Sequence, residues 1–114
     1  MAVSADIHDV TESEVVEQVK EVFRATGLAV QRINTGAFKV GSRYIRTANK
    51  GTLDFEGYDN HGRFVAFECK RPKGGRVSPE QKARIEDINR KGGIAAVVHS
   101  GEEALDLIFK MKLL

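Results

Sequence analysis

Apolar residues near the start of the chain recur at the spacing of an amphipathic helix. In this region the apolar positions are mostly three or four residues apart, and they are Val15, Val16, Val19, Val22 and Phe23. Thr11 followed three residues later by Glu14 has the pattern of a capping box, and Gly27 is typical of a helix end. The pattern predicts a helix over about residues 11–26 whose apolar stripe faces the core.

The pattern then changes to short apolar runs separated by turn residues, which is typical of β-strands. Four extended segments are expected, and they cover residues 28–33, 36–46, 52–58 and 63–70. The residues between the last two segments are typical of a turn, so these two segments should form a hairpin. The last segment is apolar on both alternating faces until its end, which predicts a central strand.

A second helix is indicated where Ser78, Pro79 and Gln81 occur together. They supply an N-cap, a proline at the first helical position and a capping-box partner. The helix should end near Lys91, because two glycines follow.

A short strand and a last helix complete the predicted elements. The apolar run 94–98 predicts a buried strand, and Ser100 with Glu103 has the pattern of a helix cap. The residues of the last helix that we expect to face inward are Ala104, Leu105, Ile108 and Phe109. The predicted order is α-β-β-β-β-α-β-α. This is a mixed α/β (α+β) fold, in which helices flank a mixed central β-sheet within one domain of residues 1–114.

Composition limits the class of protein. Of the 114 residues 41% are hydrophobic and 30% are charged, which is typical of one soluble domain. No apolar run approaches the ~20 residues that a membrane-spanning helix needs, and residues 1–10 lack the apolar core of a signal peptide. The one cysteine, Cys69, excludes an intramolecular disulfide and a Cys-rich zinc site, so we expect a cytoplasmic location.

Charge is distributed unevenly along the chain, although the net charge is only +2. Residues 1–26 carry six acidic and two basic side chains, whereas residues 28–53 carry five basic side chains and no acid. Because phosphate contacts supply most of the affinity for nucleic acid, the basic segments are candidate DNA contacts. The candidates are Arg32, Lys39, Arg43, Arg46, Lys50, Arg71, Lys73 and Arg76. The alternative is that these residues lie in solvated surface loops.

Two acids and a lysine fall on adjacent predicted strands, in a pattern typical of metal-dependent phosphodiesterases. Asp54 is early on one strand, and Glu68 and Lys70 are late on the next, on one face of it. Mg²⁺ or Mn²⁺ prefers oxygen ligands and often takes only one or two carboxylates from the protein. We therefore expect Asp54, Glu68 and the main-chain carbonyl of Cys69 to hold the metal, with Lys70 acting on the attacking water or the phosphate. The alternative is a simple Glu68–Lys70 ion pair.

Two further residues are candidates for the same site. Glu12 shares the apolar stripe of the first helix, whereas Glu14 is off the stripe and is the capping-box partner, so we favour Glu12, bound directly or through water. Asp9 as a cap for that helix, with Glu12 as its partner, is the alternative. Gln81 has a sufficient role in its own capping box, and a role near Lys70 is equally open.

Several motifs, taken in order, resemble the VRR-Nuc family of the PD-(D/E)xK nuclease superfamily. They are Glu12, residues 32–36 (RINTG), 51–54 (GTLD), 67–72 (FECKRP), 78–81 (SPEQ) and Gly92-Gly93. The proline of the superfamily name is replaced by Leu53, which looks normal for this family. The resemblance implies a restriction-endonuclease-like core and an Mg²⁺- or Mn²⁺-dependent phosphodiesterase. In it Asp54 and Glu68 bind the metal, Lys70 is catalytic, and Glu12 and Gln81 support them.

The resemblance also implies a substrate and an assembly. Small standalone members from phages and bacteria are similar to Holliday-junction resolvases, which act on four-way DNA junctions as homodimers. A chain of this kind would work in the cytoplasm of a bacterium or of a phage-infected host cell. Residues 36–46 and the last helix, 104–114, are the candidate dimer surfaces. A flap, single-strand or restriction-like nuclease, or a catalytically silent nucleic-acid-binding module, remains an alternative.

Overall fold

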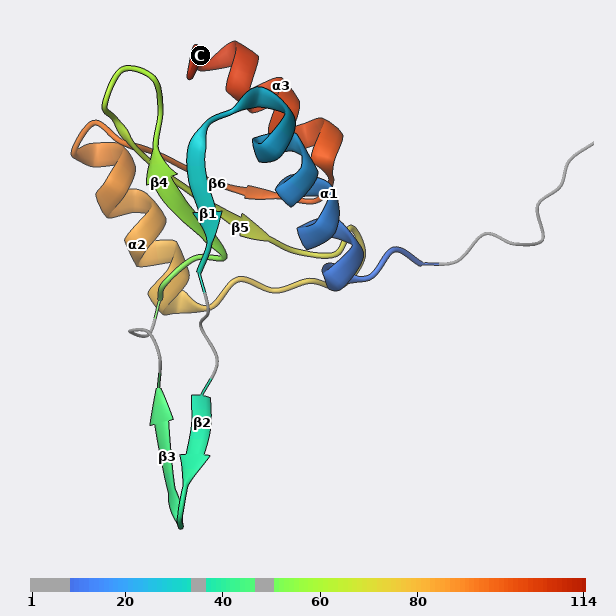
Figure 1. Ribbon diagram of the computed structural model, residues 1–114, viewed down its shortest axis with the longest axis vertical. Coiled ribbons are helices and arrows are strands. Elements are labelled where there is room, and N and C mark those ends of the chain that lie inside the picture. The colour runs from blue at the N-terminus through green and yellow to red at the C-terminus, as the bar shows by residue number, and fades with distance from the viewer. Residues whose placement is uncertain (1–8, 34–36, 47–50) are drawn as a thin grey trace, which may run out of the picture.

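The computed structural model describes residues 9–33, 37–46 and 51–114, and within them four strands form a mixed sheet on which three helices pack (Figure 1). The helices are α1 (Glu12–Thr26), α2 (Pro79–Arg90) and α3 (Gly101–Lys110). The strands of the sheet are β1 (Ala29–Arg32), β4 (Phe55–Tyr58), β5 (Phe64–Cys69) and β6 (Ile94–Val98). The predicted fold class is confirmed.

The strand order of the sheet is β1-β4-β5-β6, so β5 is an inner strand, as predicted. β1 pairs antiparallel with β4 and β4 pairs antiparallel with β5, whereas β5 and β6 are parallel and joined through α2. α1 and α3 contact one another and cover one face of the sheet, while α2 lies on the other face (Figure 1). The carboxyl end of β5 therefore lies between helices.

Local sequence explains the helix boundaries. The side chain of Thr11 accepts a hydrogen bond from the backbone of Glu14 at the start of α1, and Gly27 ends the helix with a φ of 73°. Glycine adopts this left-handed conformation at little cost. Ser78 and Gln81 form the predicted capping box of α2.

Successive side chains of β5 point to opposite faces of the sheet, and they contribute to two separate clusters of the core. Val65, Phe67 and Cys69 face α1 and α3, where the Phe67 ring centroid lies 5.5 Å from that of Phe23. Ala66 faces α2 and packs with Leu53, Ile88 and Ala95. Cys69 is a fully buried core residue, as predicted, and burial is the main cause that raises the pKa of its thiol.

The turn between β4 and β5 is held by a buried acid, Asp59. Its Oδ1 accepts hydrogen bonds from the backbone N–H groups of His61 and Arg63, and its Oδ2 accepts one from Arg63 Nε at 2.7 Å. Arg63 also donates to the carbonyls of Met111 and Lys112 beyond α3. Asp59 thus connects the hairpin to the last segment of the chain.

Residues 37–46 form a hairpin of two strands rather than one continuous extended segment. The strands β2 (Ala37–Val40) and β3 (Arg43–Arg46) pair with each other, whereas β1 pairs with β4. Gly41 turns the chain with a φ of 62°, a conformation suited to a two-residue hairpin turn. This hairpin projects away from the sheet (Figure 1).

Two further details of the sequence prediction are corrected. Phe109 is 61% exposed, whereas Ala104 and Ile108 are fully buried. A residue one position after Ile108 is turned by about 100° around the helix, which carries it off the buried stripe. β4 begins at Phe55 rather than at residue 52, so Asp54 directly precedes the strand. No helix in the described part of the chain is long and apolar enough to cross a membrane.

Candidate active site

Asp54 and Glu68 lie side by side, and each is held by the backbone of the other's segment. The N–H of Asp54 donates to Glu68 Oε1 at 3.1 Å, and the N–H of Cys69 donates to Asp54 Oδ2 at 2.8 Å. Asp54 is only 7% exposed and Glu68 only 2%. Two buried carboxylates are thereby fixed at the carboxyl end of β5.

Lys70 completes a charged cluster at this end of the sheet. Its Nζ lies 3.0 Å from Glu68 Oε2 and 3.7 Å from Glu12 Oε1 on the first turn of α1. Alternation predicted that Glu68 and Lys70 share a face, and the short distance between them agrees. The Glu12 side chain, although 49% exposed, reaches the cluster, as the stripe of α1 suggested.

Gln81 has the first of the two roles that the sequence left open. Its Oε1 accepts a hydrogen bond from the backbone of Ser78 at 3.2 Å, which is its part of the capping box. Its side chain also lies near enough to Glu68 to act to lower the pKa of that carboxyl. Because an amide side chain has a separate acceptor and donor, its N–H₂ group stays available for a partner in the candidate site.

The ionisable groups of the site shift one another's pKa values. Burial, followed by the charge of Asp54, raises the pKa of Glu68 to about 7, although Lys70 and Gln81 act in the opposite direction. Burial acts to lower the pKa of Lys70, but the hydrogen bond and charge of Glu68, with Glu12 and Asp54, outweigh it and raise the pKa. In the free protein Lys70 is therefore a cation beside acids that repel each other.

The donor chemistry of this site fits a divalent cation. The pKa of Glu68 is raised by burial and then by the charge of Asp54, and a bound cation relieves the repulsion between two such adjacent acids. The described residues contain no group of three or more His, Cys, Asp or Glu side chains that could hold a metal ion. The donors that we propose are the carboxylates of Asp54 and Glu68 and the Cys69 carbonyl, which we expect on the same side of β5 as the Cys69 N–H. Mg²⁺ accepts such a set because it keeps several waters.

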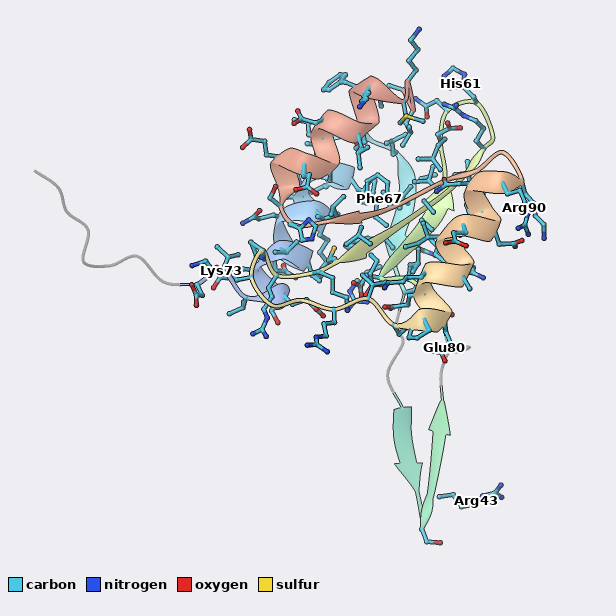
Figure 2. All side chains as sticks on the ribbon, turned by 180° about the vertical axis from the view of Figure 1, so that it is seen from behind. Arg43, His61, Phe67, Lys73, Glu80 and Arg90 are labelled. Atoms are coloured by element: carbon cyan, nitrogen blue, oxygen red, sulfur yellow. The ribbon has the colours of Figure 1, made fainter. Side chains whose placement is uncertain are left out.

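The predicted DNA contacts fall into three groups. Arg32 lies in the site itself, where its Nη1 is 3.4 Å from Asp54 Oδ1. Arg71, Lys73 and Arg76 are exposed on the loop between Lys70 and α2, and Lys73 lies 3.7 Å from Asp9. Arg43 is exposed at the end of the β2–β3 hairpin, far from Lys73 (Figure 2). The side chains of Lys39 and Arg46, and the whole of Lys50, lie outside the described residues.

Residues that the sequence analysis did not single out hold the segment before Asp54. The backbone N–H of Leu53 donates to Glu56 Oε2 at 3.4 Å, and Arg84 on α2 binds both oxygens of Glu56. Gly51 has a φ of 86°, and a Cβ there would lie 2.9 Å from the carbonyl oxygen of Glu80. Only glycine fits this close approach without strain, which is the structural reason for the glycine that opens the 51–54 motif.

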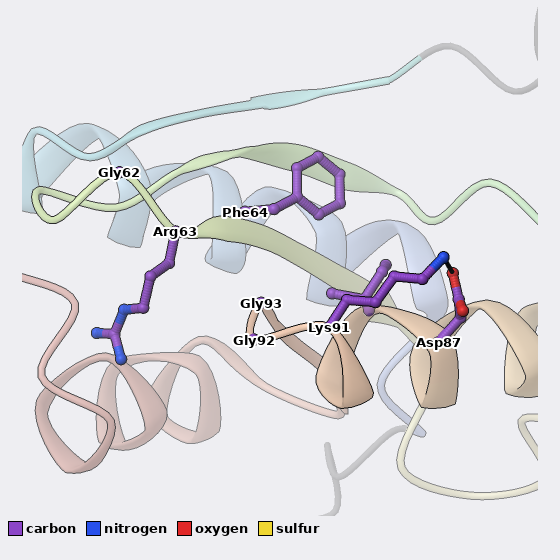
Figure 3. Close-up of a pocket in the computed structure, with 8 residues that line it drawn as sticks. Gly62, Arg63, Phe64, Asp87, Lys91, Gly92 and Gly93 are labelled. Carbon is purple, nitrogen blue, oxygen red and sulfur yellow. Dashed lines mark hydrogen bonds and ion pairs between the residues drawn. The ribbon is translucent and has the colours of Figure 1, made fainter.

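A separate hollow lies at the opposite end of β5 (Figure 3). It measures about 440 Å³ and is bordered by Arg63 and Phe64 on one side and by the Lys91–Asp87 ion pair on the other. Phe64 begins β5 and Glu68 is near its end, so the hollow is separated from the acid pair by the length of the strand. It has no adjacent pair of acids, and it is not part of the candidate site.

Comparison with known proteins leaves the family open. No protein-family model matches the chain, and no curated protein matches its sequence. The VRR-Nuc resemblance therefore stays a prediction that depends on the motifs themselves.

Proposed function

We propose that the protein is an Mg²⁺- or Mn²⁺-dependent endonuclease of the VRR-Nuc type that hydrolyses DNA phosphodiester bonds. The observation that carries this proposal is the convergence of Asp54 and Glu68 with Lys70, whose Nζ lies 3.0 Å from Glu68. Asp54 comes from the segment before β4, while Glu68 and Lys70 come from the end of β5. An ion pair alone would need neither the second buried acid nor Gln81.

Each residue of the cluster has a role in this chemistry. Asp54, Glu68 and the Cys69 carbonyl would hold the metal, which supplies an activated water and charge stabilisation at the phosphate. Lys70, a cation in the free site, stabilises negative charge on the phosphate. Glu12 holds Lys70 from the side of α1, and Gln81 orients Glu68.

The substrate and assembly that we propose are branched DNA and a homodimer in the cytoplasm. The exposed basic residues of the loop after Lys70 and of the hairpin supply phosphate contacts. Each chain contributes one acid pair, and resolving a four-way junction requires two symmetric cuts. A homodimer with twofold symmetry supplies the two sites.

The test is cleavage of a synthetic four-way junction beside linear duplex, single-stranded and flap DNA. Each substrate is incubated with Mg²⁺, Mn²⁺ or a chelator. We expect paired, symmetric nicks in the junction that require the metal. Preferred cutting of a flap or single strand would replace the resolvase-like proposal with another nuclease specificity. Binding without cutting any substrate would overturn the nuclease proposal in favour of a silent binding module.

A further inference from the structure

Arg32 differs from the other described candidate DNA contacts because it lies against a carboxylate of the candidate active site, in addition to its hydrogen bond to the carbonyl of Ile33. Its Nη1 lies 3.4 Å from Asp54 Oδ1 and 3.4 Å from the Asp54 carbonyl oxygen. By contrast, Lys73 is 83% exposed and pairs with Asp9, which is also on the surface. A guanidinium that served only as a general DNA contact would not need to lie against Asp54.

The backbone fixes where the Arg32 side chain starts. Arg32 is paired in register with Phe55 across the β1–β4 ladder, and the N–H of Ile33 donates to the Asp54 carbonyl at 2.8 Å. Arg32 at the end of β1 and Asp54 just before β4 are therefore neighbours whose backbones cannot shift independently. The fold sets the backbone position from which the Arg32 side chain reaches the acid.

Open space borders the Arg32 side chain on the side of α1. A hollow of about 280 Å³ is lined by Glu12, Ser13, Val16, Glu17, Lys20 and Arg32. The Arg32 side chain is 38% exposed, so its guanidinium can leave Asp54 without passing through the core. The residue is anchored at its backbone and free to move at its charged end.

We propose that Arg32 is a catalytic residue that binds the phosphate being cut, and that in the free protein it occupies the side of Asp54 for which a divalent cation competes. The inference rests on the proposed function, because it assigns a role within the same site. A guanidinium presents two parallel N–H donors that match a phosphate, and it stabilises the charge that develops there.

This arrangement predicts that loss of the Arg32 charge strengthens metal binding but slows cleavage. Loss of the Arg32 charge removes a cation that repels the metal and pairs with its ligand Asp54, so metal should bind more tightly. The same loss removes a donor to the phosphate, so cleavage should become slower. A residue that merely supported the fold would weaken both.

The experiment is a calorimetric titration of the whole protein with Mn²⁺, together with single-turnover cleavage at saturating Mn²⁺ and DNA. For Arg32→Gln we expect Mn²⁺ to bind about tenfold more tightly. Cleavage by this variant should be slower by about 10²-fold to 10³-fold. Arg32→Lys keeps the positive charge but loses the two parallel N–H donors of the guanidinium. This variant should therefore bind Mn²⁺ nearly as the wild type does and still cut slowly. Lys20→Gln is the matched control, because it removes one charge from the same hollow at a residue that pairs with Glu17 rather than Asp54.

The outcomes separate this inference from the proposed function. If the wild type and Glu68→Gln both fail to bind Mn²⁺, the proposed metal site itself is wrong, and the role of Arg32 falls with it. If the wild type binds Mn²⁺ but Arg32→Gln binds it equally or less tightly, the competition at Asp54 is wrong while the metal site stands. If Arg32→Gln binds more tightly yet cuts at the wild-type rate, Arg32 does not bind the phosphate.

Discussion

At the scale of single residues, the candidate site depends on side chains that have two partners each. Gln81 caps α2 and also lies near Glu68, and Asp54 accepts a hydrogen bond from the Cys69 N–H while it faces Arg32. Such residues fix the geometry of the site because a change in one contact displaces the other. Asp59 is a further case at the opposite end of β4, where it acts on stability rather than on chemistry.

Asp59→Asn should reduce the folding stability of the protein at neutral pH. It should also make that stability depend less on pH in the acidic range. Burial acts to raise the pKa of Asp59, but the hydrogen bonds from the backbone and side chain of Arg63 and from His61 outweigh it and lower the pKa. A lowered pKa means that the charged form stabilises the fold above the ordinary pKa of aspartate, and that this stability is lost as the pH falls through the lowered pKa. We expect a loss of about 2 kcal/mol at pH 7.

The measurement for Asp59 is urea unfolding of the wild type and of Asp59→Asn between pH 7 and pH 2. The difference between the two proteins should be largest at pH 7 and should shrink as the pH falls below about 4. Asp87→Asn is the control, because Asp87 is a solvent-accessible acid whose partners Arg90 and Lys91 are also exposed. A difference that stays constant over the whole range would mean that the charge of Asp59 contributes nothing.

At the scale of elements, the sequence predicted those structural features that depend only on residues close to each other along the chain. The caps at Thr11, Ser78 and Ser100 and the apolar periodicity predicted all three helices of the described residues. Alternation along β5 likewise predicted that Glu68 and Lys70 lie together. These features depend on residues within a few positions of each other, so they are readable without knowledge of the fold.

Features that depend on which elements become neighbours could not be predicted in this way. The contact between Arg32 and Asp54 exists because β1 pairs with β4, across more than twenty residues of chain. The Glu56–Arg84 pair requires the position of α2 on the sheet.

The β2–β3 hairpin should contribute to DNA binding and little to folding stability. Its strands pair with each other and not with the four-stranded sheet, and an isolated two-stranded hairpin adds little stability. In sequence it carries Lys39, Arg43 and Arg46 and no acid. Replacing residues 37–46 by two glycines should leave thermal unfolding almost unchanged while weakening DNA binding.

The measurement for the hairpin is the salt dependence of junction binding. Each lost phosphate contact should reduce the slope of log affinity against log salt by about one, so the shortened protein should lose up to about three and Arg43→Gln about one. Lys110→Gln on α3 is the control. An unchanged slope in the shortened protein would place the hairpin off the DNA path and favour its alternative role as a dimer surface.

At the scale of the whole molecule, the sheet carries its candidate chemistry at one end. Helix α1 brings Glu12 to this end from one face of the sheet, and α2 brings Gln81 from the other. The basic loop after Lys70 adjoins the site because it is continuous in the chain with Lys70, and Arg32 at the end of β1 lies in the site itself. A phosphate backbone that followed these basic segments would pass the acid pair.

The most direct test of the central claim is Mg²⁺-dependent cleavage of a four-way junction by the wild type, Asp54→Asn and Glu68→Gln. Circular dichroism verifies that each variant is folded, and Asp87→Asn controls for the loss of one acid elsewhere on the protein. If Asp54 and Glu68 hold the metal, the wild type and Asp87→Asn cut the junction, and each site variant is slower by about a thousandfold. Cleavage by Asp54→Asn or Glu68→Gln at the wild-type rate would contradict the account.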